Sequence, residues 1–243
     1  MTSLLSRTFG YESVSPQERE SRIRAVFNAV APRYDLMNDV MSFGIHRLWK
    51  RVMAKAAQPR DGQLIVDLAG GTGDVARLLA GARRRVVVCD PSVEMMAVGR
   101  NRSQGTGLDF VEGKAEAMPF ETGSVDTITI AFGLRNATSP EEGLAEIFRV
   151  LKPGGRFLCL EFSRPWALIR PFYDAYSFAV IPRLGAWIAR EPAAYSYLVE
   201  SIRRFPDQRE MAGLMGQAGF AGISWRNLSA GIACLHRGEK PIS

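Results

Sequence analysis

The sequence predicts an α/β fold, a Rossmann-like seven-stranded and mostly parallel sheet with one antiparallel strand, helices on both faces and a helical N-terminal extension. Three observations predict it. Strand-like and helix-like segments alternate between residues 64 and 162, a pattern typical of right-handed crossovers and a parallel sheet. A glycine-rich turn follows the first of these strands. The chain ends in a strand pair that reads as a hairpin, which introduces the antiparallel strand.

The chain is long enough for one large domain. It has 243 residues, of which 47% are hydrophobic and 23% charged, an ordinary balance for a globular protein. We expect residues 1–21 to form a flexible N-terminus and residues 22–243 a single domain. Within that domain, we expect residues 22–58 to form a helical lid or extension and residues 165–204 to form a hydrophobic insert.

The N-terminal extension has the pattern of amphipathic helices. Ser15 and Pro16 form a plausible N-cap and N1 pair. One face of the helix that follows carries apolar side chains, namely Ile23, Val26, Phe27 and Val30. Pro32 breaks this pattern, and a second amphipathic run follows at residues 44–57.

The elements of the core follow in order. Strands are expected at residues 64–69, 86–90, 108–113, 125–132 and 156–162, and helices near residues 74–81, 93–102 and 140–151. After the insert, we expect a helix near residues 207–218. The final hairpin is expected at residues 222–228 and 231–237.

The glycine turn is the first candidate binding site. Gly70, Gly71 and Gly73 follow the first strand, where ligands bind in doubly wound sheets. Glycines allow a sharp turn and a close approach of the ligand to the backbone. Asp90 ends the second strand, where its carboxylate can accept hydrogen bonds from both hydroxyls of a ribose. The combination predicts a ligand that contains adenosine.

The residues around the turn favour S-adenosylmethionine over a dinucleotide. Residues 69–74, AGGTGD, do not fit the dehydrogenase spacing G-x-G-x-x-G. Asp67 and Asp74 place carboxylates near the turn, which disfavours phosphates and suits a ligand with an amino group and a sulfonium. A nicotinamide-dependent oxidoreductase is the less favoured alternative.

Longer strings make the assignment more specific. They are DLAGGTGDVA (67–76), AFGLRNATSP (131–140), RVLKPGGRFLCLEFSRP (149–165), YDAYSFAVIPRLG (173–185) and YLVESIRRFPDQ (197–208). With these strings, the chain resembles the ubiquinone/menaquinone biosynthesis C-methyltransferase family of class I S-adenosylmethionine-dependent methyltransferases. The resemblance covers nearly all of the chain beyond about residue 22.

The resemblance implies methylation of a ring carbon on a polyprenylated quinol, either 2-methoxy-6-polyprenyl-1,4-benzoquinol or demethylmenaquinol or both. It implies cofactor contacts at Thr72, Asp90, Lys114 and Ala115, and the residues of the turn itself add Asp67 and Gly70 as candidates. Two positions depart from the family pattern. Lys114 stands where the family usually has Asn or Asp, and Ala131 stands where a Ser is common.

The catalytic candidates are Arg135, Asn136 and Tyr34. Arg135 and Asn136 follow the fourth strand, where an acceptor substrate would meet the cofactor, and an arginine there can stabilise a phenolate. The alternative is that Arg135 pairs with an acid and Asn136 caps the loop. Tyr34 is either part of a lid or a packing aromatic, and His46 is expected in a structural or surface role. The remaining base candidates are Glu161, Asp174 and Tyr176.

The charge pattern and the insert bear on partners. The formal charge is +6, and the basic residues lie mainly in short clusters. This pattern favours solvent-exposed helix faces and loops as the interpretation, with contact to an anionic lipid surface as the second choice. Nucleic-acid binding is not expected. Residues 165–190 are apolar but interrupted by prolines and arginines, so we do not expect them to span a bilayer. They form either a packing insert or a channel for a prenyl tail.

We expect a cytoplasmic protein that contacts the inner face of the membrane peripherally. Cys89, Cys159 and Cys234 share no metal-binding spacing, so no metal site is expected and reduced thiols suit the cytosol. A homodimer or a quinone-synthesis complex is left open, as is the rival function of a non-catalytic, cofactor-binding scaffold subunit in such a complex.

Overall fold

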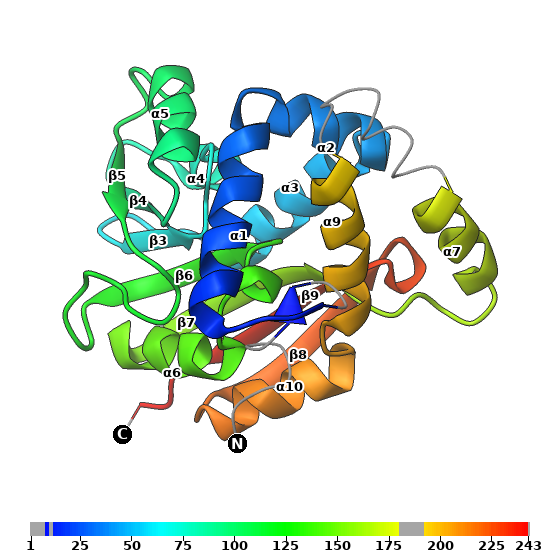
Figure 1. Cartoon of the computed structure of the whole chain (residues 1–243). Coiled ribbons are helices and arrows are strands. Elements are labelled where there is room, and N and C mark those ends of the chain that lie inside the picture. Colours follow the sequence, from blue (N-terminus) through cyan, green and yellow to red (C-terminus); the bar gives the residue numbers. More distant parts are fainter. Residues whose placement is uncertain (1–7, 10–11, 180–191, 243) are drawn as a thin grey trace.

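A computed structural model of the chain describes residues 8–9, 12–179 and 192–242 (Figure 1). Its central sheet has seven strands in the order β5-β4-β3-β6-β7-β9-β8. Their bounds are β3 Leu64–Leu68, β4 Arg85–Asp90, β5 Leu108–Glu112, β6 Val125–Ala131, β7 Leu151–Phe162, β8 Ala221–Leu228 and β9 Ala233–Glu239. β9 is antiparallel to both of its neighbours, and the other pairs are parallel. The fold class that the sequence predicts is confirmed.

The helices precede, connect and follow these strands. Their bounds are α1 Pro16–Val30, η2 Ala31–Arg33, α2 Tyr34–Ser42, α3 Ile45–Ala57, α4 Asp74–Leu79, α5 Val93–Arg102, η3 Leu134–Asn136, α6 Pro140–Val150, α7 Arg170–Ala179, α9 Pro192–Arg204, α10 Gln208–Gln217 and η4 Ser229–Gly231. A short hairpin of β1 Thr8–Phe9 and β2 Glu12–Ser13 precedes them. Residues 1–7, 10–11 and 180–191, which belong to the expected N-terminus and insert, lie outside the described residues.

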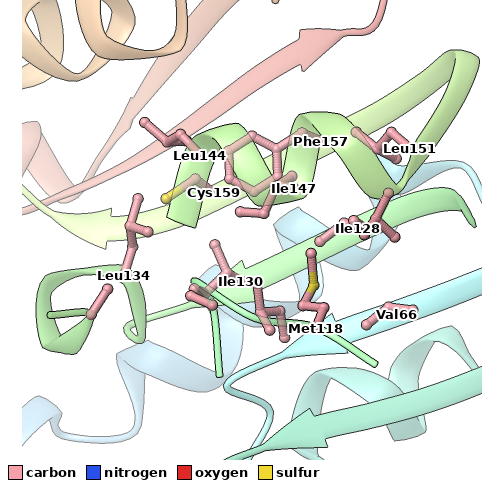
Figure 2. Close-up of a cluster of buried hydrophobic side chains, with 14 of the residues drawn as sticks. Val66, Met118, Ile128, Ile130, Leu134, Leu144, Ile147, Leu151, Phe157 and Cys159 are labelled. Atoms are coloured by element: carbon pink, nitrogen blue, oxygen red, sulfur yellow. The ribbon is translucent and has the colours of Figure 1, made fainter. Parts of the chain in front are cut away.

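Alternate strand residues supply two cores, one on each face of the sheet. In β3, Val66 and Leu68 face α6 and α10, whereas Ile65 faces α3 and α4. Figure 2 shows the first of these cores, with strand side chains packed against Leu144 and Ile147 of α6. Because successive side chains of a strand point to opposite faces, the apolar runs of the central strands bury both faces at once.

The N-terminal extension forms as the sequence pattern indicates. The Oγ of Ser15 accepts a hydrogen bond from the backbone N–H of Glu18 at 3.1 Å, which caps α1. Pro32 ends the α-helix in the short η2, and α2 follows directly. Phe43 and Gly44 then adopt left-handed backbone conformations, which turn the chain into α3.

The boundary expected at residue 21 falls inside α1, which begins at Pro16. Arg19 is only 2% exposed. Its guanidinium donates to the carbonyl oxygens of Ala137 at 2.7 Å, Arg135 at 3.1 Å and Thr8 at 2.9 Å. A charged group with these bonds anchors α1 to the loop after β6. In Figure 1, α1 and α9 lie on the same side of the sheet.

Candidate functional site

The turn between β3 and α4 depends on its glycines. A Cβ on Gly70 would lie 2.8 Å from both the carbonyl oxygen and Oδ2 of Asp67. Gly71 and Gly73 have φ angles of +53° and +80°, which disfavour residues with a Cβ. The chain can therefore reverse tightly at the carboxyl end of β3, where the sequence predicts a ligand.

Asp67 holds this turn against the sheet. Its Oδ1 accepts a hydrogen bond from the hydroxyl of Thr129 on β6 at 2.8 Å, and its Oδ2 accepts one from the backbone N–H of Ala76 on α4 at 3.0 Å. Burial raises the pKa of Asp67 to about 7, against the effect of these hydrogen bonds. The carboxyl thus joins two strands and a helix N-terminus.

Asp90 lies beside the same turn. Its Oδ2 accepts a hydrogen bond from the backbone N–H of Gly71 at 2.8 Å, and its Oδ1 accepts one from that of Ser92 at 2.8 Å. Burial raises the pKa of Asp90 to about 6. Each oxygen retains acceptor capacity for a second donor, such as a hydroxyl of a bound ribose.

Two strand ends have strained backbones. Ala69 after β3 and Phe132 after β6 have φ angles of +49° and +58°, uncommon values for residues with a side chain. A Cβ on Gly133 would lie 2.6 Å from the Cβ of Ala69, so the two strand ends nearly touch. Strain of this kind clusters at functional sites, and both Ala69 and Phe132 line the cavity described next.

A cavity opens at this point between the strand ends and α1, and we call it the turn-side cavity. Seven of the site residues expected from the sequence line it, namely Tyr34, Asp67, Gly70, Asp90, Lys114, Ala115 and Asn136. Further walls come from Ile23 and Phe27 of α1 and from Met95 of α5. The cavity thus combines carboxylates with apolar surfaces.

Thr72 was expected to bind the cofactor, but it does not line this cavity. It is buried, and its hydroxyl donates to Oδ1 of Asp35 at 3.2 Å. Arg102 forms an ion pair with the other carboxylate oxygen of Asp35. Thr72 thus connects α2 to the glycine turn, and Arg102 connects α2 to the end of α5.

Arg135 does not line the turn-side cavity either. Its Nη1 lies 3.1 Å from Oε2 of Glu161 and also donates to the carbonyl oxygen of Phe132. Burial raises the pKa of Glu161, and the charge of Arg135 opposes that rise. This geometry matches the alternative in which Arg135 pairs with an acid, and Glu161 is occupied by that pair.

Asn136 and Lys114 are both held by other side chains. Oδ1 of Asn136 accepts a hydrogen bond from the hydroxyl of Tyr197 on α9 at 3.1 Å. Nζ of Lys114 lies 3.3 Å from Oε2 of Glu20 on α1, at the rim of the turn-side cavity. Two residues that line the turn-side cavity are thus held by α9 and α1, which lie outside the sheet.

Asp74, which the sequence predicts to repel a phosphate, is paired with two cations. Lys50 contacts its Oδ2 at 2.8 Å, and Arg77 pairs with its Oδ1. The negative charge of Asp74 is therefore compensated. Asp67 and Asp90 form no ion pair within the described residues, and their buried carboxyl groups remain the acids that disfavour a phosphate.

A second cavity, which we call the apolar cavity, lies beside the first. Tyr34 and Phe132 line both cavities, so the two are neighbours across these rings. Its volume is about 350 Å³. Among its other lining residues are Phe43, His46, Trp49, Arg135, Phe162, Ile169, Phe172, Tyr173, Tyr176, Leu198 and Ile202. The rings of Trp49, Phe132 and Phe162 pack against one another with centroids 4.7–6.2 Å apart.

Two remaining base candidates are committed to structural contacts. The hydroxyl of Tyr176 donates to the carbonyl oxygen of Met41 at 2.8 Å, and Oδ1 of Asp174 lies 2.9 Å from Nη2 of Arg203.

Sequence reasoning missed Arg19 and Lys50, whose partners are far away along the chain. It also missed the contact between Asp39 and His46, although their spacing across a glycine-containing turn was a readable signal.

Comparison with known proteins agrees with this architecture. The model of the ubiE/COQ5 methyltransferase family matches residues 15–240. The chain is 64% identical to the ubiquinone/menaquinone biosynthesis C-methyltransferase UbiE of Rubrivivax gelatinosus, over 97% of this chain and 94% of that protein. It is 47% identical to the UbiE of Edwardsiella ictaluri, over 96% of each chain.

Solved structures share the fold. A SAM-dependent methyltransferase from Thermotoga maritima matches with a TM-score of 0.65 and 22% identity, over 90% of this chain and 99% of the other. The cyclase SpnF matches with a TM-score of 0.68 and 15% identity, over 92% and 97%. With a family model that spans most of its length and two nearly full-length relatives, this chain belongs to the ubiE/COQ5 methyltransferase family.

Proposed function

We propose that the protein transfers a methyl group from S-adenosylmethionine to a ring carbon of a polyprenylated quinol, in ubiquinone or menaquinone biosynthesis or in both. The observation that carries this proposal is the pair of neighbouring cavities that share Tyr34 and Phe132. One has buried carboxyl groups at a glycine turn, and the other is mostly apolar. Methyl transfer needs two ligands to meet end to end across such a boundary.

The turn-side cavity fits S-adenosylmethionine by the chemistry of its donors and acceptors. The carboxylate of Asp90 has acceptor capacity for the ribose hydroxyls, and the backbone of Ala115 lies in the wall where the adenine would lie. Phe27 and Met95 supply apolar surface for that ring. When bound, the compound supplies an electrophilic methyl group on a sulfonium, which is a good leaving group.

The apolar cavity fits an aromatic ring that carries a prenyl chain. Phe132, Trp49 and Phe162 provide ring surfaces near the boundary, and Ile169 and Phe172 lead outward. We infer that the quinol ring lies at Phe132 and Tyr34 and that the chain extends past α7. Exclusion of water from this cavity would make the quinol oxygen more sensitive to nearby charges.

One side chain is proposed to act on the quinol directly and two to order the site around it. Arg135 lines the apolar cavity, and its Nε is buried with no hydrogen-bond partner among the described residues. Within the described residues, Nη1 is the guanidinium nitrogen that Glu161 contacts, so the rest of the guanidinium can stabilise a developing phenolate. Tyr34 is proposed to order the boundary, and Asn136 to order the loop after β6 through Tyr197.

We propose that the mouth of the apolar cavity contacts the cytoplasmic face of the membrane. Phe43, Leu168 and Phe172 are 77%, 84% and 76% exposed there, and Phe43 and Phe172 also line the cavity. Figure 1 shows α7 at the edge of the molecule, away from the sheet. No helix in the described ranges is long and apolar enough to cross a bilayer, so the proposed contact is peripheral.

Anaerobic assays with purified protein test the function. Labelled S-adenosylmethionine is supplied with short-chain 2-methoxy-6-prenyl-1,4-benzoquinol or with demethylmenaquinol, and products are identified by mass spectrometry. We expect one methyl group on a ring carbon of at least one acceptor. Binding of S-adenosylmethionine without transfer to either acceptor would favour the scaffold function instead. Quinone profiling of a deletion strain then identifies the physiological acceptor by the precursor that accumulates.

A further inference from the structure

His46 on α3 combines three properties that the sequence did not reveal together. The residue is only 4% exposed and lines the apolar cavity. Its Nε2 lies 2.9 Å from Oδ1 of Asp39 on α2. Its Nδ1 is buried and has no hydrogen-bond partner within the part of the chain that the structure describes. A buried imidazole nitrogen without a partner costs free energy, which a ligand group could recover.

The contact with Asp39 selects the tautomer of His46. A carboxylate is an acceptor only, so Nε2 carries the proton and Nδ1 becomes the acceptor. Asp39 stays ionised because Arg47 donates to both of its oxygens at 2.6 Å, which helps to hold the pKa of Asp39 at about 2. The carboxylate orients the ring and can stabilise an imidazolium once that ring accepts a proton.

The charged groups around His46 come from several elements. Asp39 of α2 and Asp74 of α4 raise the pKa of the imidazole, and Lys50 of α3 lowers it. Burial is the largest effect and brings the pKa of His46 below its ordinary value. Arg135 of η3 lines the same cavity, as do the phenols of Tyr34, Tyr173 and Tyr176. At neutral pH the ring is therefore neutral and able to accept a proton.

We propose that His46 is the general base of the reaction and that Asp39 is its positioning residue. This inference rests on the proposed function, because it requires a quinol in the apolar cavity. Nδ1 of His46 accepts the proton of a quinol hydroxyl while the ring carbon forms its bond to the methyl group, and the carbon–sulfur bond breaks. The product ring is first a neutral dienone. It then loses its ring proton to water and regains a proton on oxygen from His46.

The roles of His46 and Arg135 are complementary. An arginine remains protonated at neutral pH and can only donate hydrogen bonds, so it stabilises negative charge but does not remove a proton. The imidazole supplies the missing acceptor. Both residues line the apolar cavity, and neither requires the turn-side cavity, which leaves that cavity to the methyl donor.

The chain offers a matched control, because its other histidine is buried in a similar way. His236 on β9 is 2% exposed, its Nε2 lies 3.0 Å from the carbonyl oxygen of Gln208, and its Nδ1 likewise lacks a partner among described residues. It lines neither cavity. Burial lowers the pKa of both histidines. Of the two, only His46 lines the apolar cavity and can contact a ligand there.

Kinetics of the full-length protein test the proposal first. We expect His46→Gln to lower kcat about 100-fold or more, with little change in the affinity for S-adenosylmethionine. At saturating S-adenosylmethionine, the substitution should also remove the acidic limb of the pH profile of kcat. His236→Gln should retain both kcat and that limb. Asp39→Asn should move the limb to lower pH, because the charge that raises the pKa of His46 is lost. Wild-type kcat and an unchanged limb in His46→Gln would overturn the proposal.

Nitrogen NMR of the histidines provides a test that does not depend on turnover. The probe is 1,4-dihydroxynaphthalene, added with S-adenosylhomocysteine so that no methyl can be transferred. We expect the Nδ1 resonance of His46 to shift as it accepts a hydrogen bond, whereas that of His236 stays in place. A resonance of His46 that does not respond to bound probe would contradict its role as base. An absence of methyl transfer by the wild-type protein would instead refute the proposed function.

Discussion

Nη1 of Arg135 lies 3.1 Å from Oε2 of Glu161, and both side chains are almost fully buried. Removing one member of a buried ion pair leaves an uncompensated charge. We expect Glu161→Gln to lower the free energy of unfolding by roughly 3–5 kcal/mol, measured by urea denaturation. Asp109→Asn is the control, because its partner Arg85 is 70% exposed and such pairs contribute little. Equal effects of the two substitutions on the free energy of unfolding would mean that the buried charge of Arg135 does not depend on Glu161 for compensation.

Asp90 should determine the affinity for the methyl donor. We expect Asp90→Asn to weaken binding of S-adenosylmethionine about 10- to 100-fold, since a charged acceptor for ribose hydroxyls contributes roughly 1.5–3 kcal/mol. In the wild-type protein, affinity should fall as the pH drops below about 6, where Asp90 takes up a proton. Calorimetric titration measures both effects. An undiminished pH dependence in Asp90→Asn would assign it to another group.

Asp67 should make the unliganded protein less stable as the pH rises. Its pKa is about 7 in the folded protein, against an ordinary value of 3.8. The folded state therefore binds the proton more tightly, and the resulting stability is present below pH 3.8 and is lost as the pH rises through 7. The full effect is on the order of 4 kcal/mol. Thermal denaturation across this range should show a smaller decline for Asp67→Asn than for the wild-type protein. Parallel curves would contradict the assignment.

Lys114 should limit the contact with the adenine. An ammonium only donates hydrogen bonds, and the adenine amino group needs an acceptor. We expect Lys114→Asn to strengthen binding of S-adenosylmethionine about 3- to 10-fold, in keeping with one net hydrogen bond. Lys114→Met should show no such gain, although it also breaks the contact with Glu20. A similar gain in both variants would trace the effect to release of α1.

Exposed aromatic side chains at the cavity mouth should carry the membrane contact. We expect the double variant Phe43→Ser and Phe172→Ser to bind anionic phospholipid vesicles at least about 10-fold more weakly, because each apolar ring contributes roughly 1.5–3 kcal/mol when buried. Ile242→Ser is the control, since Ile242 is 84% exposed and lines neither cavity. Vesicle co-sedimentation measures the difference, and equal binding by both variants would refute this surface.

Local sequence patterns were sufficient for most of the fold. The alternation of segments, the Ser15 cap of α1 and the helix over Val93–Arg102 depend on neighbours within a few residues, so periodicity and capping reveal them. The turn at Gly70 was equally readable, because a close approach of backbone atoms there excludes any side chain. The boundary expected at residue 21 lies within α1, where Arg19 is held by carbonyl groups more than a hundred positions away, contacts that no local pattern reveals.

The sequence by itself determined the sheet, the glycine turn and the carboxyl group of Asp90, because each follows from local backbone preferences or from a motif with fixed spacing. Only the tertiary structure decided which side chains face a cavity and which are already paired. It paired Arg135 with Glu161, turned Thr72 toward Asp35, and placed His46 in the apolar cavity with Asp39 behind it. Folding brings hydrogen-bonding groups together with partners that are distant in the sequence, and local sequence patterns do not identify those partners.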